Sequence, residues 1–200
     1  MTFLVLSQIL NGLAIGMLYA LMAVGLTLIL GVLNIPNFAH GVLYALGAYF
    51  TYTISELTGS FYVAILVAPF LVVLVGFVLE SQGIKRLYQA HHDYQLLFLF
   101  AVALILQEVI IIVWGPVGFS VLPPAALSGA VDLGLLVYPK YRLALVVFSA
   151  LVIFSLYFFL TRTNLGAILR AGIENREMVT VLGIDINKVF FLTFGLGAYL

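Results

Sequence analysis

Polar residues able to bind a solute interrupt the apolar sequence in the segment Asn34-Ile35-Pro36-Asn37-Phe38-Ala39-His40-Gly41. We expect Asn37 to cap a helix that starts here, with His40 in its first turn, where the positive end of the helix dipole favours the neutral imidazole. Helix N-termini at membrane depth bind carboxylates. We therefore predict that Asn34, Asn37, His40 and Gly41 line a path for an anionic or zwitterionic solute.

A simpler interpretation of the same residues stays open. Asn37 then only caps the helix, and His40 forms a hydrogen bond to a neighbouring helix. A second polar pair, Gln107-Glu108, lies shortly before Trp114. It suits either a proton relay or a helix-packing hydrogen bond from Gln107 with Glu108 near the lipid headgroups, as the interfacial Trp114 suggests.

Catalytic motifs are missing from the sequence. Cysteine is absent, and His91-His92 has no Glu-x-x-His frame for a metal. The sequence contains no Gly-x-Ser-x-Gly elbow, and none of the three lysines follows a glycine as in a phosphate-binding loop. We predict no catalytic residue, metal or cofactor, and any ATP used would be hydrolysed by another chain.

Composition places the chain in a membrane. Of its 200 residues, 64% are hydrophobic and 8% charged, and the mean hydropathy is +1.24, whereas soluble domains carry about a quarter charged residues. The net charge is zero, which argues against nucleic acid as a partner. The first charged residue is Glu56, so the preceding stretch is expected in the lipid bilayer or deep inside protein.

Helices that cross about 30 Å of hydrocarbon need roughly 20 mostly apolar residues. Uncharged runs of this kind predict five complete spans and the start of a sixth, at residues 9–30, 38–55, 61–79, 94–113, 143–160 and 189–200. Small residues recur at helical spacing in the first two, which favours close helix packing: Gly12, Gly16, Ala20, Gly41, Ala45 and Ala48. The expected fold is an all-α polytopic bundle forming a single domain over residues 1–200.

Basic residues predict the orientation, because short cytoplasmic loops are enriched in them. The loops at 80–93 and 161–188 hold Lys85, Arg86, Arg162, Arg170, Arg176 and Lys188, and the other side holds only Lys140 and Arg142. We therefore expect the loop at 161–188 in the cytoplasm. The Gly- and Pro-rich loop at 115–140 and the N-terminus are expected outside.

The cytoplasmic loop has helical patterning of its own. Leu165, Ile168, Leu169 and Ile173 predict an amphipathic helix capped by Asn164. A second short helix should follow from Glu174 and stop at Gly183, after which Asp185 caps the next span. This second helix carries the apolar side chains Met178, Val181 and Leu182 on one face, so we expect either a cytoplasmic partner or the protein's own helix ends to cover it.

The chain resembles the permease subunits of bacterial ABC importers for branched-chain amino acids, the LivH-like group. The residues that carry this resemblance lie in three segments: Asn11-Gly12 through Thr27, Asn34 through Gly41 with Gly47-Ala48-Tyr49, and Arg170-Ala171 through Leu182-Gly183-Ile184. In such permeases a Glu-Ala-Ala-x-x-x-Gly pattern forms the coupling helix that docks into the ATPase. Glu177 and Gly183 keep this spacing, with Met178 and Val179 in place of the alanines.

The resemblance implies a passive subunit in the bacterial inner membrane, forming part of the path for branched-chain amino acids. It implies as partners a second homologous permease subunit, two ATPase subunits and an extracytoplasmic solute-binding protein. The residues expected to couple to the ATPase are Arg170, Glu174, Asn175, Arg176, Glu177 and Gly183. Members of this group usually continue through further spans, so the chain is expected to lack its C-terminal part.

Two alternatives remain at this stage. A urea or short-amide permease shares the same motifs. An ATP-independent facilitator or intramembrane enzyme would need an interior pair of ionisable groups, for which Glu108 is the one candidate.

Overall fold

The computed structural model describes residues 2–33, 37–87, 90–132, 134 and 137–199, without the side chains of residues 2, 3, 32, 33, 176, 177, 186, 187 and 190. It is almost entirely helical, with the elements in the following order. They are α1 (Thr2–Leu33), α2 (His40–Thr58), α3 (Phe61–Gln82), η1 (Ile84–Leu87), α4 (His92–Trp114), η2 (Ala125–Leu127), β1 (Ala130–Asp132), β2 (Val137–Pro139), α5 (Lys140–Arg162), α6 (Asn164–Glu174), α7 (Arg176–Val181) and α8 (Ile186–Tyr199).

Four helical segments are long and apolar enough to cross a membrane: Leu4–Gly31, Phe61–Leu87, His92–Trp114 and Lys140–Arg162. They correspond to the predicted first, third, fourth and fifth spans. The predicted second span forms α2, which is less apolar because it carries threonines, Ser55 and Glu56. α2 packs along α3 and also against α4. The polytopic all-α architecture is thus confirmed, with four spans supported by length and composition.

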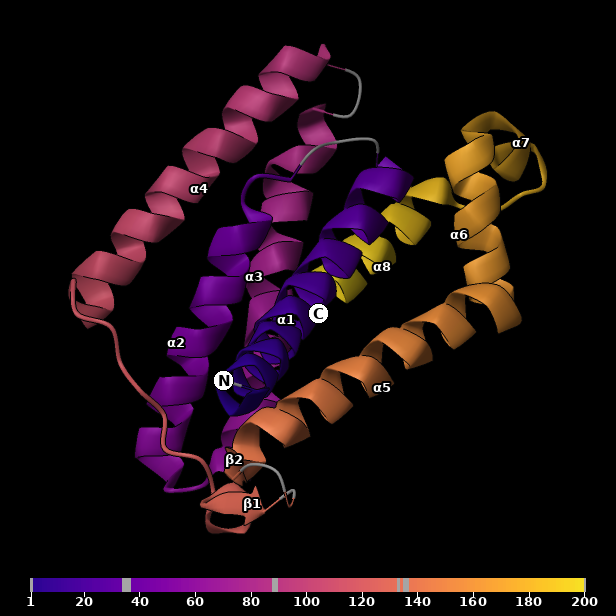
Figure 1. The fold of residues 1–200 in the computed structure, drawn as a ribbon. Coiled ribbons are helices and arrows are strands. Elements are labelled where there is room, and N and C mark those ends of the chain that lie inside the picture. Colours follow the sequence, from indigo (N-terminus) through magenta and orange to yellow (C-terminus); the bar gives the residue numbers. More distant parts are fainter. Residues whose placement is uncertain (1, 34–36, 88–89, 133, 135–136, 200) are drawn as a thin grey trace.

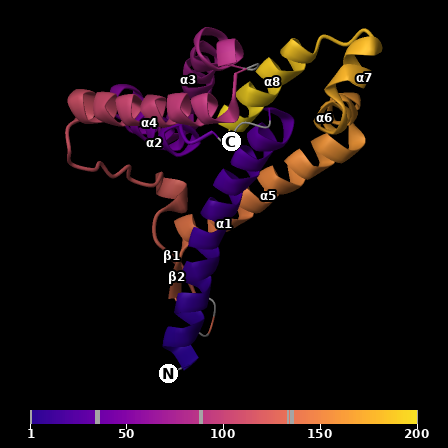
Figure 2. The ribbon, with the colours of Figure 1, turned by 90° about the horizontal axis from the view of Figure 1, so that it is seen from above.

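Helix α8 is the centre of the bundle, because α1 and α3 both pack on it. Figure 1 shows α1, α3 and α8 together in the middle, with α4 and α5 at the two sides. Turned by 90°, Figure 2 shows the first half of α1 projecting away from the other helices. This projecting part leaves large apolar side chains such as Leu4 and Ile9 more than half exposed.

Glycines bring α8 close to both neighbours. A Cβ at Gly25 of α1 would lie 3.2 Å from the Gly197 carbonyl oxygen, and a Cβ at Gly197 would lie 3.2 Å from the Gly25 carbonyl oxygen. The two backbones therefore almost touch, as small residues allow in membrane helices. On the other side, a Cβ at Gly76 of α3 would lie 3.1 Å from the Ala198 Cβ.

The loop at 115–140 is more structured than the Gly and Pro content suggested. It contains η2 and an antiparallel hairpin in which Val131 of β1 pairs with Tyr138 of β2. The Tyr138 hydroxyl donates to Asn11 Oδ1 of α1 over 3.1 Å, and Arg142 Nη1 donates to the same oxygen. Asn11 therefore joins the projecting part of α1 to the hairpin and to the start of α5.

We expect Asn11→Ala to loosen this hairpin. Tyr138 is only 3% exposed, and a buried hydroxyl that loses its partner costs about 1–3 kcal/mol. Trypsin cleavage after Lys140 and Arg142 in the purified protein should become faster. Asn11→Asp keeps the acceptor and serves as the matched control; equal cleavage rates in Asn11→Ala and the unsubstituted protein would contradict the prediction.

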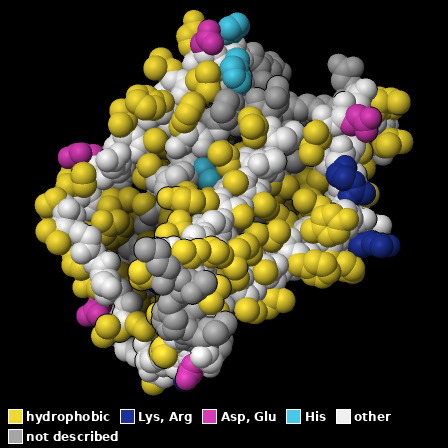
Figure 3. Space-filling model, viewed as in Figure 1, with side chains coloured by type: hydrophobic (Ala, Val, Ile, Leu, Met, Phe, Trp, Pro, Cys, Tyr) yellow, Lys and Arg dark blue, Asp and Glu magenta, His cyan; other side chains and the backbone are white. Residues whose placement is uncertain are grey.

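Apolar and charged side chains are separated on the surface. Figure 3 shows hydrophobic side chains over most of the visible face, while the coloured Lys, Arg, Asp and Glu side chains lie towards its margins. Helix α5 is an extreme case, since only Ser149 and Leu156 are buried along it. Such a surface suits lipid or other membrane helices rather than water.

Candidate functional site

The polar segment predicted as a solute path lies at the start of α2, where α1 and α8 also meet. Ala39, not Asn37, occupies the N-cap position, so the predicted cap is wrong by two residues. Asn37 instead accepts a hydrogen bond at Oδ1 from the Ala39 backbone N–H over 3.1 Å. Asn side chains form such turns readily with the backbone two residues on. His40 does lie in the first turn, as predicted.

His40 is held against the first helix. Its Nε2 lies 3.1 Å from the Met22 carbonyl oxygen, which can only accept, so Nε2 carries the proton. The ring also packs on Gly25, where a Cβ would lie 3.1 Å from Nε2. This is the helix-to-helix hydrogen bond of the simpler interpretation.

Two atoms in this segment remain without a partner among the described residues. They are Asn37 Nδ2 and His40 Nδ1, on side chains that are 3% and 6% exposed. Buried polar atoms are nearly always paired, so this segment keeps the capacity to bind a polar group. Gly41 is exposed with no atom near its missing Cβ, and Asn34 lies outside the described residues. A role in the solute path stays a prediction for all four.

The small residues predicted for helix packing have few neighbours within the chain. A Cβ at Gly12 or Gly16 would meet no atom within 4 Å, and Ala20 and Ala45 are half-buried. Gly47 brings α2 against α3 instead, since its Cβ would lie 3.3 Å from Val72 Cγ2. Packing at Gly12 and Gly16 is not seen among the described residues and stays a prediction.

A hollow of about 350 Å³, the inner chamber, lies between α2 and α3, reaches the end of α8 and is open to the surface, where Tyr44, Ile65 and Tyr199 are 42%, 45% and 44% exposed. Its lining residues are mainly aliphatic or small, with a few that carry a hydroxyl group: Leu43, Ala48, Ile65, Ala68 and Val72, and Tyr44, Thr51, Tyr141 and Tyr199. Pro69 also lines it and has no N–H to donate to the Ile65 carbonyl one turn earlier. The chamber thus has mainly apolar walls, and the proline interrupts the backbone hydrogen bonds of the helix beside it.

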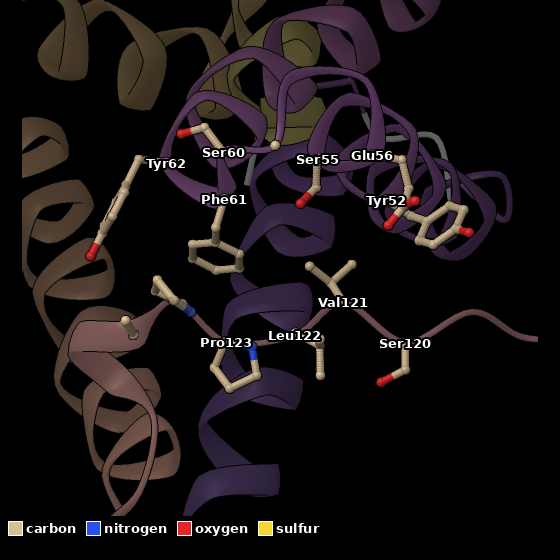
Figure 4. Close-up of a pocket in the computed structure, with 13 residues that line it drawn as sticks. Tyr52, Ser55, Glu56, Ser60, Phe61, Tyr62, Ser120, Val121, Leu122 and Pro123 are labelled. Carbon is tan, nitrogen blue, oxygen red and sulfur yellow. The ribbon is translucent and has the colours of Figure 1, made fainter.

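A second cavity of about 500 Å³, the outer chamber, lies where α2 ends and α3 begins. It is more polar than the inner chamber, with five hydroxyls and one carboxylate on residues Tyr52, Ser55, Ser60, Tyr62, Ser120 and Glu56. The loop after α4 closes one side with Leu122 and Pro123, as Figure 4 shows. No Lys or Arg is among the described residues that line it.

Aromatic contacts fix the loop over this chamber. Phe119 stacks on Tyr52 with ring centroids 4.3 Å apart, and its edge meets Tyr49. Trp114 Nε1 donates to Thr53 Oγ1 over 2.8 Å. The end of α4 and the start of the loop, at Trp114 and Phe119, are therefore anchored to α2.

The predicted amphipathic helix at 164–173 forms α6 (Asn164–Glu174), but its cap and its buried face differ from the prediction. Thr163 caps it instead of Asn164, accepting from the Gly166 backbone N–H over 3.0 Å. The buried face is Gly166, Leu169 and Gly172, whereas Leu165 and Ile173 are about half exposed. Hydrophobic spacing does not identify glycine as a packing residue, although the missing side chain of Gly166 lets α6 lie directly on α5.

The predicted second short helix forms α7, which starts at Arg176 and not at Glu174, the last residue of α6. It stops as expected before Gly183, which has φ +80°. Asn175 caps α7 by accepting from the Met178 backbone N–H over 3.0 Å, and Arg170 and Glu174 are exposed. The side chains of Arg176 and Glu177 lie outside the described residues. Of the apolar residues here, Val179 is buried, while Met178, Val181 and Leu182 are 65%, 83% and 76% exposed.

Comparison with known families decides the class of protein. The family described as the branched-chain amino acid transport system / permease component matches residues 8–200. The chain belongs to this permease family.

Relatives of the permease carry consistent names. It is 28% identical to the high-affinity branched-chain amino acid transport system permease protein BraD of Pseudomonas aeruginosa, over 98% of this chain and 67% of the relative. It is 26% identical to LivH of Escherichia coli K12, over 96% and 67%, and to a probable LivH of Methanocaldococcus jannaschii, over 86% and 56%. No solved structure matches it.

Sequence reasoning missed both chambers of the permease. Pro69 was the one available signal, because a proline within an apolar span frees a carbonyl that lipid cannot satisfy. Gln107 and Glu108, considered as a relay or packing pair, are both exposed on α4. Within the described ranges, no group of three His, Asp or Glu residues is close enough to hold a metal ion.

Proposed function

We propose that the chain is the membrane-spanning permease subunit of an ATP-binding cassette importer. It forms part of the path for branched-chain amino acids and couples to separate ATPase subunits, without hydrolysing ATP itself. The names of the relatives support the transport system. The structural observation that supports coupling to the ATPase subunits is the exposed apolar face of α7.

The lining of the inner chamber favours an aliphatic solute. Leu43, Ile65 and Val72 present hydrocarbon to it, and burying the side chain of a branched amino acid against such walls is favourable. Urea or a short amide would leave these walls unused and would need more polar partners than the chamber offers. Aliphatic amino acids are therefore the preferred solutes.

The apolar face of α7, formed by Met178, Val181 and Leu182, is the proposed ATPase contact. Neither α6 nor α8 covers it, since all three side chains are mostly exposed. Several exposed apolar side chains on one face are typical of protein interfaces. The positive φ of Gly183 ends α7 and sets the direction in which this face points.

We expect Val181→Ser to reduce ATPase subunits that co-purify with the permease by about tenfold, because interface anchors of this size are worth 1–2 kcal/mol. The thermal unfolding midpoint should not change, since the side chain is 83% exposed. Val137→Ser is the matched control: it is also exposed, at 65%, but lies on β2 at the other end of α5. Equal co-purification in the two variants would count against the proposed contact.

Charge supports the orientation in the bacterial inner membrane. Most Lys and Arg residues belong to the η1 region and to the α5–α8 connection, whereas Lys140 and Arg142 start α5 at its other end. We therefore propose that the region 161–188 lies in the cytoplasm, and that the region 115–140 and the N-terminus lie outside. The outer chamber then faces the extracytoplasmic solute-binding protein.

A second permease subunit is the proposed neighbour of α1. Gly12 and Gly16 are open and flanked by exposed Leu13 and Ile15. A small groove between larger apolar side chains is what another membrane helix can fill. This subunit would complete the path on the side that the present chain leaves open.

A further inference from the structure

The surface of α5 has a hollow close to the end of the helix. It has a volume of about 590 Å³, and the described residues that line it all belong to α5: Phe154, Tyr157, Phe158, Thr161 and Arg162. The first four recur at spacings of three and four residues, which places them on one face of the helix. The three aromatic side chains are more than half exposed, so the described part of the chain leaves this face open.

The hollow connects the apolar face of a span to its charged end. α5 is long and apolar enough to cross a membrane, and it ends at Arg162. Phe154 lies eight residues earlier, which corresponds to about 12 Å along a helix. Tyrosine and arginine are typical of the boundary between hydrocarbon and water. The aromatic side chains are therefore placed to meet acyl chains, and Arg162 is placed to meet lipid headgroups.

The free polar groups of the hollow are hydrogen-bond donors. The Thr161 hydroxyl already donates to the Tyr157 carbonyl oxygen over 2.8 Å. The Arg162 guanidinium and the Tyr157 hydroxyl have no hydrogen-bond or ion-pair partner among the described residues. A guanidinium can only donate, and a phosphate oxygen can only accept. A phosphate group therefore matches what the hollow offers.

Charge at the corner between α5 and α6 also favours an anion. The sequence contains no acidic residue between Asp132 and Glu174. Arg170 is exposed on α6, which packs against α5. Figure 3 shows Lys and Arg side chains at the end of α5 and over α6, beside the hydrophobic side chains of α5. A zwitterionic headgroup would bring a further positive charge next to these arginines, whereas an anionic headgroup would not.

We propose that this hollow binds an anionic phospholipid. Arg162 and the Tyr157 hydroxyl donate to its phosphate, and Arg170 adds a second positive charge nearby. One acyl chain lies along Phe154 and Phe158. Clusters of basic side chains at the end of a span are the usual means of binding anionic headgroups. The site involves neither the solute nor the ATPase subunits, so it does not depend on the proposed function.

Fluorescence quenching beside the hollow tests the proposal. Leu151→Cys places a single thiol on the same face of α5, because Leu151 is 62% exposed and the chain has no cysteine of its own. The full chain, labelled there with bimane, is reconstituted in phosphatidylcholine vesicles that contain increasing fractions of a phospholipid with a nitroxide on its acyl chain. Nitroxide-labelled phosphatidylglycerol should reach half-maximal quenching at a mole fraction about fivefold lower than nitroxide-labelled phosphatidylcholine, which is the effect of one basic side chain near the membrane surface.

Arg162→Gln should raise this mole fraction about fivefold for phosphatidylglycerol and leave it unchanged for phosphatidylcholine. Arg86→Gln is the matched control: it removes an exposed arginine from η1, which does not line the hollow. It should change neither value. Unchanged quenching in Arg162→Gln would overturn the proposal. An equal change in both variants would also overturn it, because general attraction between the protein and an anionic membrane would then be sufficient.

Other occupants of this face predict different results. A second copy of the chain, or another helix packed on α5, would keep both nitroxide lipids away from position 151. Absence of quenching by either lipid would therefore overturn the proposal. Equal half-maximal mole fractions for the two lipids would overturn it as well, since they would show that the face meets bulk lipid without selection.

Discussion

Replacing Gly166 by alanine should destabilise the permease, because the added methyl group would meet the backbone of α5. A Cβ at this position would lie 2.5 Å from the Phe159 carbonyl oxygen and 2.6 Å from the Leu160 Cα. Both are backbone atoms at the end of α5 and cannot rotate away. Overpacking of this kind costs about 1–3 kcal/mol or occasionally more, and it should lower the thermal unfolding midpoint in detergent.

Thr163 joins α5 to α6 at a sharp corner, so the two helices cannot separate to make room for the added methyl group. The Thr163 hydroxyl donates to the Phe159 carbonyl over 2.7 Å and accepts from the Gly166 N–H over 3.0 Å. One side chain therefore ends α5 and begins α6, and moving Gly166 away breaks the second of these bonds.

Gly16→Ala is the matched control for this prediction. It adds the same methyl group within a helix, but no atom lies within 4 Å of the new Cβ. Alanine is favoured over glycine in helix interiors by roughly 0.5–1 kcal/mol, so this variant should be neutral or slightly stabilised. If Gly166→Ala unfolds at the same temperature as Gly16→Ala, the steric explanation of the corner is wrong.

Replacing Gly197 by alanine should weaken the contact of α8 with α1. The new Cβ would lie 2.6 Å from Ile29 Cδ1 and 3.2 Å from the Gly25 carbonyl oxygen. Ile29 is fully buried, so its side chain can turn only by displacing its neighbours. We expect a loss of about 1–3 kcal/mol, measured as a lower unfolding midpoint, with Gly16→Ala again as the reference.

A double variant separates this clash from other effects. Ile29→Ala removes the side-chain atoms that oppose the new methyl group and alone costs about 2–5 kcal/mol through the cavity. Combined with Gly197→Ala, it should cost less than the sum of the two, by a coupling of about 0.5–3 kcal/mol. Strictly additive effects would show that the two residues do not oppose each other.

The positions of the helices were predictable because they depend on local composition. The predicted spans agree with α2 to α5 to within about three residues, since charges, glycines and prolines interrupt the apolar runs at their ends. The stop of α7 before Gly183 was predictable for a similar reason: only glycine adopts a positive φ without strain. The predicted start of the first span at Ile9 is too late, since α1 begins at Thr2. Apolar residues continue almost to the N-terminus, so composition does not mark where this helix begins.

The contacts between helices were not predictable from spacing alone. Gly12 and Gly47 belong to helices with similar small residues, yet Gly47 packs on Val72 and Gly12 is open. Which glycine finds a neighbour depends on the angle at which two helices cross, and the sequence of one helix does not contain that angle. The chambers were missed for the same reason, as their walls come from α2, α3 and a distant loop.

Helix α5 is fixed at both of its ends. It starts beside Asn11, which holds Tyr138 and Arg142, and it ends at the Thr163 corner under α6. Its 23 residues contain no internal proline and extend over about 35 Å. In the proposed orientation the helix connects the cytoplasmic α6 to the extracytoplasmic hairpin, so we expect a tilt of α6 to displace the hairpin.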